Sequence, residues 1–509
     1  MPQQAAAARS LSFWIDSATL PVFPRLQQDH VVDVVIVGGG LTGLTTAYLL
    51  QKAGKRVALL ERNRCAQVDT AYTTAHLTMV TDERLTNLVS RFGRDHAQAV
   101  WDAGLAAISQ IDEIVRAESI ACGFEWVAGY LHLPPQGDGA GVATLQEDAA
   151  LAADMGFDAS FVDAVPLMSA AGIRFDGQAR FHPRQYLAGL ARAIREAGGE
   201  IFEHSAADDF SADPLSVTAN GHTIRCDDIV LATHNPLVGL SGVLSATMFQ
   251  TKLALYTSYV VAGRVAPGTA PDALFWDTGD PYRYFRIEPH RDFDMVIFGG
   301  QDHKTGQATD PATCYRHLEE QLTALIPDVD ITHRWSGQVI ETPDGLPYIG
   351  QTTDHQYAGT GFAGNGMTFG TLTGMMSADA ILARTNPWVE LFEPGRKAIR
   401  HGAWEYLKEN VDYPYYLIRD RFAGAEGRSL RSIRRGTGQV IERNGMKVAA
   451  YRDDDGKTTL RSATCTHMGC RVGWNDTERT WDCPCHGSRF TPAGDVLSGP
   501  AESPLEPVE

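Results

Sequence analysis

Four cysteines and two histidines near the C-terminal end have the types and spacing that metal chemistry needs. They form two segments, Cys465-Thr-His467-Met-Gly-Cys470 and Cys483-Pro-Cys485-His486. The first segment contains a C-x-H pair and the second a C-x-x-H pair, and fifteen residues separate His467 from Cys483. In a cytosolic protein, such crowding indicates metal or redox chemistry rather than a disulfide framework.

Two kinds of metal site fit this spacing. In one, two thiolates, from Cys465 and Cys483, hold one iron of a [2Fe–2S] cluster, and two imidazoles, from His467 and His486, hold the other. The alternative is a tetrahedral zinc site with four cysteine or histidine ligands. A zinc site leaves two of the six candidate ligands without a function, so we favour the cluster.

The segment closely resembles the Rieske proteins of the cytochrome bc type. The resemblance implies a disulfide between Cys470 and Cys485 that braces the two cluster loops, a pair that oxygenase-type Rieske domains lack. Two loop features follow from the same resemblance: Ser488 donates a hydrogen bond to a cluster sulfur, and residues 499–501 (Gly-Pro-Ala) form the proline loop that covers the cluster. His467 and His486 are expected to present their outer nitrogens near the surface, where electrons can leave or enter.

Phe490 stands where bc-type proteins usually carry a tyrosine that donates a second hydrogen bond to the cluster. A lost donor lowers the reduction potential of the cluster. We therefore expect a potential below that of respiratory Rieske proteins.

A second chemical motif lies near the N-terminal end. Gly38, Gly40 and Gly43 form a G-x-G-x-x-G pattern between a predicted buried strand (residues 31–37) and a predicted helix (residues 44–53). A second strand is predicted over residues 55–60, and Glu61 follows it, about 20 residues after the glycines. This order is typical of a dinucleotide fold, in which the helix N-terminus binds the pyrophosphate and the acid binds ribose hydroxyls.

The far end of this domain favours FAD over NAD. A second glycine-rich turn, G-T-G-F-A-G-N-G-M-T-F-G over residues 359–370, opens a predicted helix that ends at residue 384. With the motifs F-H-P-R-Q-Y-L (181–187), V-L-A-T (230–233) and T-P-D-G-L-P-Y-I-G (342–350), residues 31–384 resemble the D-amino-acid-oxidase-like FAD family. The strand that ends A-T-G in that family ends here in A-T-H, with His234 in place of glycine.

The resemblance implies the residues that contact FAD: Glu61 and Arg62 at the adenosine ribose, Ala207 at the adenine, and the second glycine-rich turn at the isoalloxazine ring. The full predicted set is Gly38, Gly40, Thr42, Gly43, Glu61, Arg62, Thr73, Thr74, Ala207, Ala232, Thr233, Gly364, Asn365, Gly366, Met367 and Thr368.

The substrate site is less sharply defined by the sequence. A predicted antiparallel sheet over residues 251–299 carries Tyr256, Tyr259, Tyr284 and Arg286, which can form a roof over the flavin. We predict His76, Tyr284 and Arg286 as catalytic residues, with Arg286 binding a substrate carboxylate and His76 acting as a base. The alternative for the tyrosines and Trp335 is core packing, and for Arg286 a surface salt bridge.

The predicted fold class is an α/β Rossmann-type FAD-binding domain with an antiparallel-sheet substrate subdomain, followed by a small all-β Rieske domain. The FAD-dependent domain is expected over residues 1–389. Its FAD-binding parts fall at about 30–80, 180–240 and 335–385, and its substrate subdomain at about 85–180 and 245–330. A helical linker (390–428) then leads to the Rieske domain (429–509).

These features predict an FAD-dependent dehydrogenase that oxidises a small substrate, an amine or amino acid, at a C–N bond. Electrons would pass from the flavin through the cluster to an external acceptor. Two alternatives stay open: a partner reduces the cluster, which feeds the flavin, or the chain is a redox module without a small substrate. The sequence shows no obvious second dinucleotide site for NAD(P)H as an internal hydride donor.

Composition limits the expected partners and location. The 509 residues carry a net charge of −18, which argues against nucleic acid and anionic membranes as partners. No apolar run is long enough to span a bilayer, and we find no secretory signal. The cytoplasm is the expected location.

Overall fold

The structure is a computed structural model, and it describes residues 8–134, 141–235, 253–307, 310–396, 430, 433–443 and 445–508. The predicted linker falls almost wholly on 397–429, outside the described residues; before it, the short helix α10 (Val389–Phe392) lies at the end of the FAD-dependent part.

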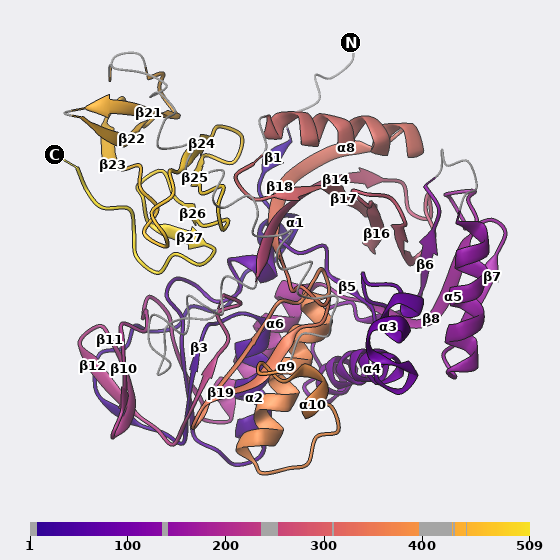
Figure 1. The fold of residues 1–509 in the computed structure, drawn as a ribbon, viewed down its shortest axis with the longest axis horizontal. Coiled ribbons are helices and arrows are strands. Elements are labelled where there is room, and N and C mark those ends of the chain that lie inside the picture. Colours follow the sequence, from indigo (N-terminus) through magenta and orange to yellow (C-terminus); the bar gives the residue numbers. More distant parts are fainter. Residues whose placement is uncertain are drawn as a thin grey trace.

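A six-stranded, mostly parallel sheet forms the base of the molecule (Figure 1). Its strands, in spatial order, are β19 (Tyr348–Thr353), β20 (Gln356–Thr360), β13 (Asp228–Leu231), β3 (Val34–Val37), β4 (Val57–Leu60) and β9 (Glu200–Phe202). Only the β19–β20 pairing is antiparallel. Near-continuous apolar strands are expected here, because both faces of a parallel sheet are covered.

The two faces of this sheet pack against different layers. Val34 and Ile36 of β3 point into a core shared with the helices α2 (Leu41–Lys52), α6 (Pro183–Glu196) and α9 (Gly366–Ile381). Val35 and Val37 point to the other face, because side chains alternate along a strand. That face is covered by a small sheet of β10 (Asp209–Ala212), β11 (Leu215–Ala219), β12 (His222–Arg225) and β2 (His30–Val31).

A ten-stranded sheet arches over the end of this base (Figure 1). Its order is β1 (Arg9–Ser10), β18 (Asp330–Glu341), β14 (Ala254–Val265), β17 (Asp294–Lys304), β16 (Tyr284–Pro289), β15 (Ala273–Asp277), β6 (Glu125–His132), β8 (Gly172–Arg180) and β5 (His76–Leu77), with β7 (Ala159–Val162) paired to β8. The helix α8 (Pro311–Leu325) packs on the outer face of β14 and β17. The inner face looks toward the base.

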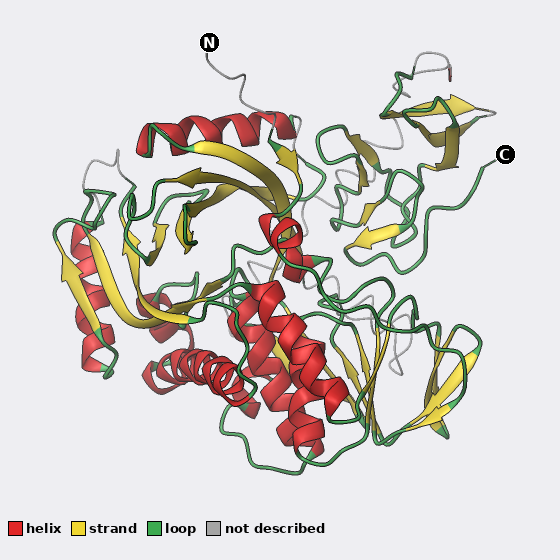
Figure 2. Ribbon diagram, turned by 180° about the vertical axis from the view of Figure 1, so that it is seen from behind, coloured by secondary structure: helices red, strands yellow, loops and turns green. Residues whose placement is uncertain are grey.

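Further helices flank these two sheets. They are α1 (Phe13–Ser17), η1 (Asp69–Ala71), α3 (Leu85–Phe92), α4 (Arg94–Ala117) and α5 (Val142–Asp154). Seen from behind, α4 lies close to the helices of the base (Figure 2), and it contacts α9.

The C-terminal module is built from two small antiparallel sheets. One contains β21 (Thr437–Arg443), β22 (Met446–Arg452) and β23 (Thr458–Ser462); the other contains β24 (Gly473–Asn475), β25 (Thr480–Asp482), β26 (Arg489–Phe490) and β27 (Val496–Ser498). The module, drawn in yellow, sits beside the edge of the large sheet that carries β1 and β18 (Figure 1).

The predicted fold class is confirmed: a parallel α/β base, a largely antiparallel sheet above it and an all-β C-terminal module are all present. Predicted elements agree to within a few residues, for instance the helix predicted over residues 44–53, which is α2 (Leu41–Lys52). Across the described residues, no helix has the length and apolar character that crossing a membrane requires.

Candidate functional site

The first glycine turn is built for close backbone contacts. Gly38 has a φ of +112°, and a Cβ at Gly43 would lie 1.9 Å from the Gly38 carbonyl oxygen. The helix α2 and the strand β3 therefore approach at a distance that only glycine allows. Gly40 caps α2 without a side chain, so the first turn of the helix presents backbone N–H groups to the adjoining cavity.

Glu61 closes the next strand at the same cavity. Its carboxylate accepts hydrogen bonds from the Gly39 and Asn63 backbone N–H groups, each at 2.8 Å. Burial raises the pKa of Glu61 above its ordinary value. This carboxylate is fixed beside the glycine turn, where an acid that binds ribose hydroxyls is expected.

The second glycine turn leads into α9 on the far side of the cavity. Asn365 donates to the Val80 carbonyl at 3.1 Å, and Thr368 donates to the Thr78 carbonyl at 2.8 Å. These bonds hold the start of α9 against residues 78–82. Asp82 lies directly beside the turn, because a Cβ at Gly364 would come within 2.5 Å of the Asp82 Oδ2 atom.

One cavity of about 730 Å³ connects the two turns. Of the sixteen residues predicted to contact FAD, fourteen line it; Gly43 and Thr368 instead support the adjoining helices. Glycine turns at both ends, a helix N-terminus and a buried acid form a cradle that fits a bound FAD.

His234 occupies the position where the resembling family has glycine. Its φ is +62°, in the left-handed region that glycine favours. Its ring stacks on Phe362 at 5.2 Å, and its Nδ1 atom lies 2.9 Å from Asp69 Oδ2. The backbone conformation is therefore kept, and the side chain becomes part of the cavity wall.

Arg286 does not reach the cavity, and the prediction that it binds a substrate carboxylate is wrong. Its side chain is fully buried and paired with Glu288, and its Nη1 group donates to the Ala75 carbonyl at 2.7 Å. Arg286 lies on the same strand face as Tyr284 but two residues farther along, beyond the end of the cavity. Its guanidinium is therefore bound by partners inside the protein and does not face the substrate cavity.

His76 and Tyr284 do line the cavity, with their rings 5.9 Å apart. The His76 Nε2 atom lies 3.3 Å from the Phe285 carbonyl, which accepts only from a protonated nitrogen, so the remaining Nδ1 faces the Thr74 hydroxyl. Burial, and then the charge of Arg286, lower the pKa of His76 to about 3. A group held neutral to such a low pH is a weak base.

The other aromatic candidates belong to the protein interior. Tyr259 is buried against Tyr315 and His303 on the outer face of the large sheet. Trp335 is buried and donates to the Tyr72 carbonyl at 3.0 Å. Tyr256 does not line the cavity. For Tyr259 and Trp335, the alternative of core packing therefore agrees with the structure.

The sequence prediction missed a polar recess at the end of the cavity near Gly364, made by Asp82, Ser258, Tyr282, Tyr284 and Asp302. The Ser258 hydroxyl donates to Asp302 and meets the Tyr284 hydroxyl, both at 2.5 Å, and Tyr282 donates to Asp82 at 3.3 Å. Burial, reinforced by the Asp302 charge, raises the pKa of Asp82 to about 7; burial raises that of Asp302 to about 6. A β-bulge at Ser258 re-aims this side chain, which no sequence pattern revealed.

In the C-terminal module, two loops bring the predicted cluster ligands together. The rings of His467 and His486 are 4.9 Å apart, and burial lowers the pKa of each to about 4, which keeps both imidazoles neutral as metal ligands require. The neighbouring Cys483 thiol is the main influence that lowers the pKa of the Cys465 thiol to about 7. Both ring nitrogens of His467 are buried without a hydrogen-bond partner among the described residues. This donor set fits a two-iron cluster.

Because its ring nitrogens are buried, His467 does not present its outer nitrogen at the surface, contrary to expectation. The neighbouring Thr466 hydroxyl donates to the Ser503 carbonyl at 2.6 Å. That bond holds the end of the loop after β27 against the first cluster loop.

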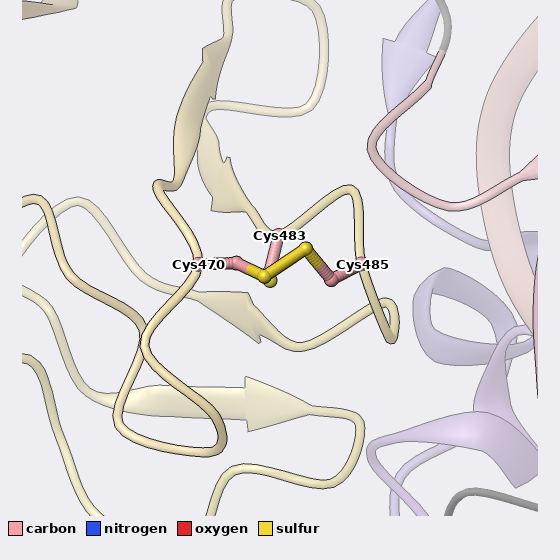
Figure 3. A group of neighbouring side chains, drawn as sticks. All are labelled: Cys470, Cys483 and Cys485. Carbon is pink, nitrogen blue, oxygen red and sulfur yellow. A yellow bond between two sulfur atoms is a disulfide. The ribbon is translucent and has the colours of Figure 1, made fainter. Parts of the chain in front are cut away.

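A disulfide joins Cys470 and Cys485, as the resemblance implied (Figure 3). Figure 3 also shows Cys483 beside it, and the three sulfur atoms lie within 4.8 Å of one another. These three cysteines are not a metal site by themselves, since two of them carry no free thiolate. Cys483 remains the ligand candidate.

Two further residues pack around the cluster loops. Ser488 is fully buried and accepts a hydrogen bond from the Ala501 N–H at 3.1 Å, and its hydroxyl helps to lower the pKa of the Cys465 thiol. Phe490 is also fully buried, in the apolar core of the module. The loop at residues 499–501 therefore closes over Ser488.

A buried polar network joins the module to the large sheet. Glu478 accepts hydrogen bonds from Tyr315 at 2.6 Å and from Ser336 at 2.8 Å. Arg489 pairs with Asp482 at 3.1 Å and also reaches Ser336. Because Arg489, Asp482 and Ser336 are buried and Glu478 is partly buried, the network fixes the orientation of the module on the sheet.

The second cluster loop itself touches the FAD-dependent part. Gln338 donates to the Gly487 carbonyl at 2.8 Å, and Gln307 donates to the Pro484 carbonyl at 3.3 Å. Residues 497–503, which include the proline loop, line the same cavity as the first glycine turn. The walls of this cavity therefore come from both halves of the chain.

Comparison with known proteins agrees with this architecture. Residues 33–380 match the family model described as FAD dependent oxidoreductase, and residues 428–509 match the Rieske [2Fe-2S] domain. A Bacillus subtilis protein named as a Rieske 2Fe-2S iron-sulfur protein, YhfW, is 34% identical over 98% of this chain and 97% of its own. The cytochrome b6-f complex iron-sulfur subunit of Chlorobaculum tepidum is 41% identical over 14% of this chain and 39% of its own.

Among solved structures, glycine oxidase from Geobacillus kaustophilus superposes with a TM-score of 0.60 at 18% identity. The match covers 72% of this chain and 99% of that enzyme. At this identity the likeness shows a shared fold.

Proposed function

The chain belongs to the FAD dependent oxidoreductase family and carries a C-terminal Rieske [2Fe-2S] domain, and we propose that it is a dehydrogenase with an internal electron relay. Its substrate is a small amine or amino acid oxidised at a C–N bond. Electrons leave through the Rieske domain to an external acceptor. FAD supplies a two-electron hydride acceptor, and the Rieske cluster supplies a one-electron carrier.

Separate sets of residues in this chain bind the two cofactors. The N-terminus of α2 and Glu61 bind the nucleotide, and the turn at Gly364 with the start of α9 lies at the reactive end. Cys465, His467, Cys483 and His486 hold the cluster, and the Cys470–Cys485 disulfide ties the two cluster loops together. Tyr284 and the polar recess orient the substrate.

One observation carries the proposal: residues 497–503 of the Rieske domain line the same cavity as the glycine turn of the dinucleotide motif. The polar network of the partly buried Glu478 and the buried Arg489 supports a fixed contact between the two parts. A fixed contact suits electron transfer inside one chain better than exchange with a separate carrier.

The domain limits remain part of the proposal: residues 1–389, 390–428 and 429–509. We also propose a cytoplasmic location.

The test is anaerobic addition of amines and amino acids to the holoprotein, with flavin absorbance and the Rieske EPR signal recorded together. We expect a substrate that bleaches the flavin and also produces the signal of the reduced cluster. Bleaching by substrate while the cluster stays oxidised would contradict the relay. Flavin reduction only by a reduced carrier protein would reverse the direction of electron flow.

A further inference from the structure

The polar recess combines negative charge with hydroxyl groups at one end of the cavity. Asp82 is open to the cavity but surrounded by protein, and the Tyr282 hydroxyl is its hydrogen-bond donor. Behind the wall, Asp302 accepts from Ser258, which in turn receives the Tyr284 hydroxyl. Two carboxylates therefore act on the same end of the cavity, one in contact with it and one through Ser258.

This acidic end is the end that faces the second glycine turn. Asp82 Oδ2 lies within 2.5 Å of a Cβ placed on Gly364, and Asn365 is bonded to Val80, two residues before Asp82. A group bound at Asp82 therefore lies beside the turn that leads into α9, where the reacting end of the substrate is expected.

Positive charge lies elsewhere. Among the described residues that line the cavity, the arginines are Arg62 and Arg64, which follow Glu61 at the nucleotide end. Arg64 is already paired with Glu203 at 2.7 Å. Arg286 is turned away and His76 is held neutral. The described wall of the recess thus offers no guanidinium to a substrate carboxylate.

Apolar side chains form the remaining wall near the recess. Val260 follows two residues after Ser258 on β14, and Trp276 lies on β15 with its ring stacked on Phe175. Such a wall suits an alkyl chain, and an aromatic face also attracts a cation. The recess therefore offers an organic cation an acidic side chain and an aromatic face. Its described wall offers a carboxylate no guanidinium partner.

We propose that the recess selects an alkylammonium substrate without an α-carboxylate, with Asp82 binding the cation and Asp302 as a positioning residue that acts through Ser258. This inference rests on the proposed dehydrogenase function and narrows its substrate class from amine or amino acid to amine. A free carboxylate in the recess would face two acidic side chains, Asp82 directly and Asp302 through Ser258, and that repulsion disfavours amino acids.

Matched ligand pairs test the charge preference directly. Butylamine and norvaline differ by one α-carboxylate, as do 1,4-diaminobutane and ornithine. Binding is measured by calorimetry on the anaerobic, dithionite-reduced holoprotein, in which no turnover occurs. We expect each amine to bind roughly tenfold or more tightly than its amino acid, since one charge contact changes affinity by at least that factor. Equal or tighter binding of the amino acids, or no binding of either amine, would overturn the proposal.

Three variants locate the effect. Asp82→Asn should weaken amine binding roughly tenfold while leaving amino acid binding almost unchanged, so that the ratio of the two affinities falls. Asp302→Asn should lower the same ratio by a smaller factor, whereas a merely structural loss would weaken both ligands alike. Asp354→Asn, in the exposed turn between β19 and β20, is the control and should change neither. If Asp82→Asn leaves the ratio of amine to amino acid affinity unchanged, Asp82 is not the cation-binding residue.

Failure of this inference can be told apart from failure of the proposed function. If an amino acid bleaches the flavin and reduces the cluster while Asp82→Asn changes nothing, the dehydrogenase stands and the amine preference falls. If amines bind in an Asp82-dependent way but no compound bleaches the flavin, the ligand class stands and the dehydrogenase falls.

Discussion

The two candidate cofactor sites are assembled in opposite ways. The cluster ligands come from two short loops between Cys465 and His486, braced by one disulfide. The walls of the FAD cavity come from segments spread over the chain from Val37 to Ser503. A site made of local loops depends on a few residues and is tolerant of its surroundings, whereas a distributed site depends on the whole fold. Variants that remove one site while sparing the other test that difference.

The largest expected effect is the loss of the cluster in Cys483→Ser. A serine hydroxyl is a poor replacement for a thiolate, so we expect no Rieske EPR signal and almost no bound iron. FAD content should stay close to that of the wild type, because Cys483 does not line the cavity. Cys314→Ser, which changes a free, half-buried cysteine, should keep both cofactors. Loss of FAD along with iron would show that the two sites are not separable.

The contact between the halves should come next in magnitude. In Arg489→Met, the buried Asp482 and the partly buried Glu478 lose their partner, which we expect to cost about 3–5 kcal/mol of unfolding free energy. Thermal unfolding measures this, and cluster reduction by substrate should slow. The matched control is Arg479→Met, whose pair with Asp454 is exposed and should cost at most about 1 kcal/mol. Equal destabilisation by the two variants would refute the buried network.

Gly43→Ala tests the distributed site with a single methyl group. The added Cβ would collide with the Gly38 carbonyl, so α2 must move away from β3, at a cost of about 1–3 kcal/mol. We expect a lower FAD content with an unchanged Rieske signal. Gly473→Ala, where the Cβ would meet nothing within 4 Å, serves as the control. Normal FAD content in Gly43→Ala would show that α2 adjusts without harm.

The smallest effect concerns the tuning of the cluster. Phe490→Tyr should raise the reduction potential of the cluster, because the new hydroxyl donates a hydrogen bond to the site. Redox titration followed by EPR measures the shift, and Phe490→Leu, which adds no donor, should show none. A potential that does not rise in the tyrosine variant would mean that Phe490 does not account for the expected potential below that of respiratory Rieske proteins.

The local site was largely predictable from the sequence, because the C-x-H and C-x-x-H spacings specify the ligands directly. The glycine turns predicted both ends of the FAD cavity for the same reason. Arg286 was misjudged because alternation along β16 gives its face but cannot say where the cavity ends. Asp82 lies in a loop before α3, and Ser258 lies at a β-bulge that links it to Asp302, so only the folded chain brings the polar recess together.

The most direct test of the account is the rate at which the cluster is reduced after the substrate reduces the flavin. Rapid-freeze EPR under anaerobic, single-turnover conditions should show the Rieske signal growing at a rate that does not depend on protein concentration, since both sites belong to one chain in fixed contact. A rate that rises in proportion to protein concentration, or no Rieske signal despite a reduced flavin, would contradict the internal relay.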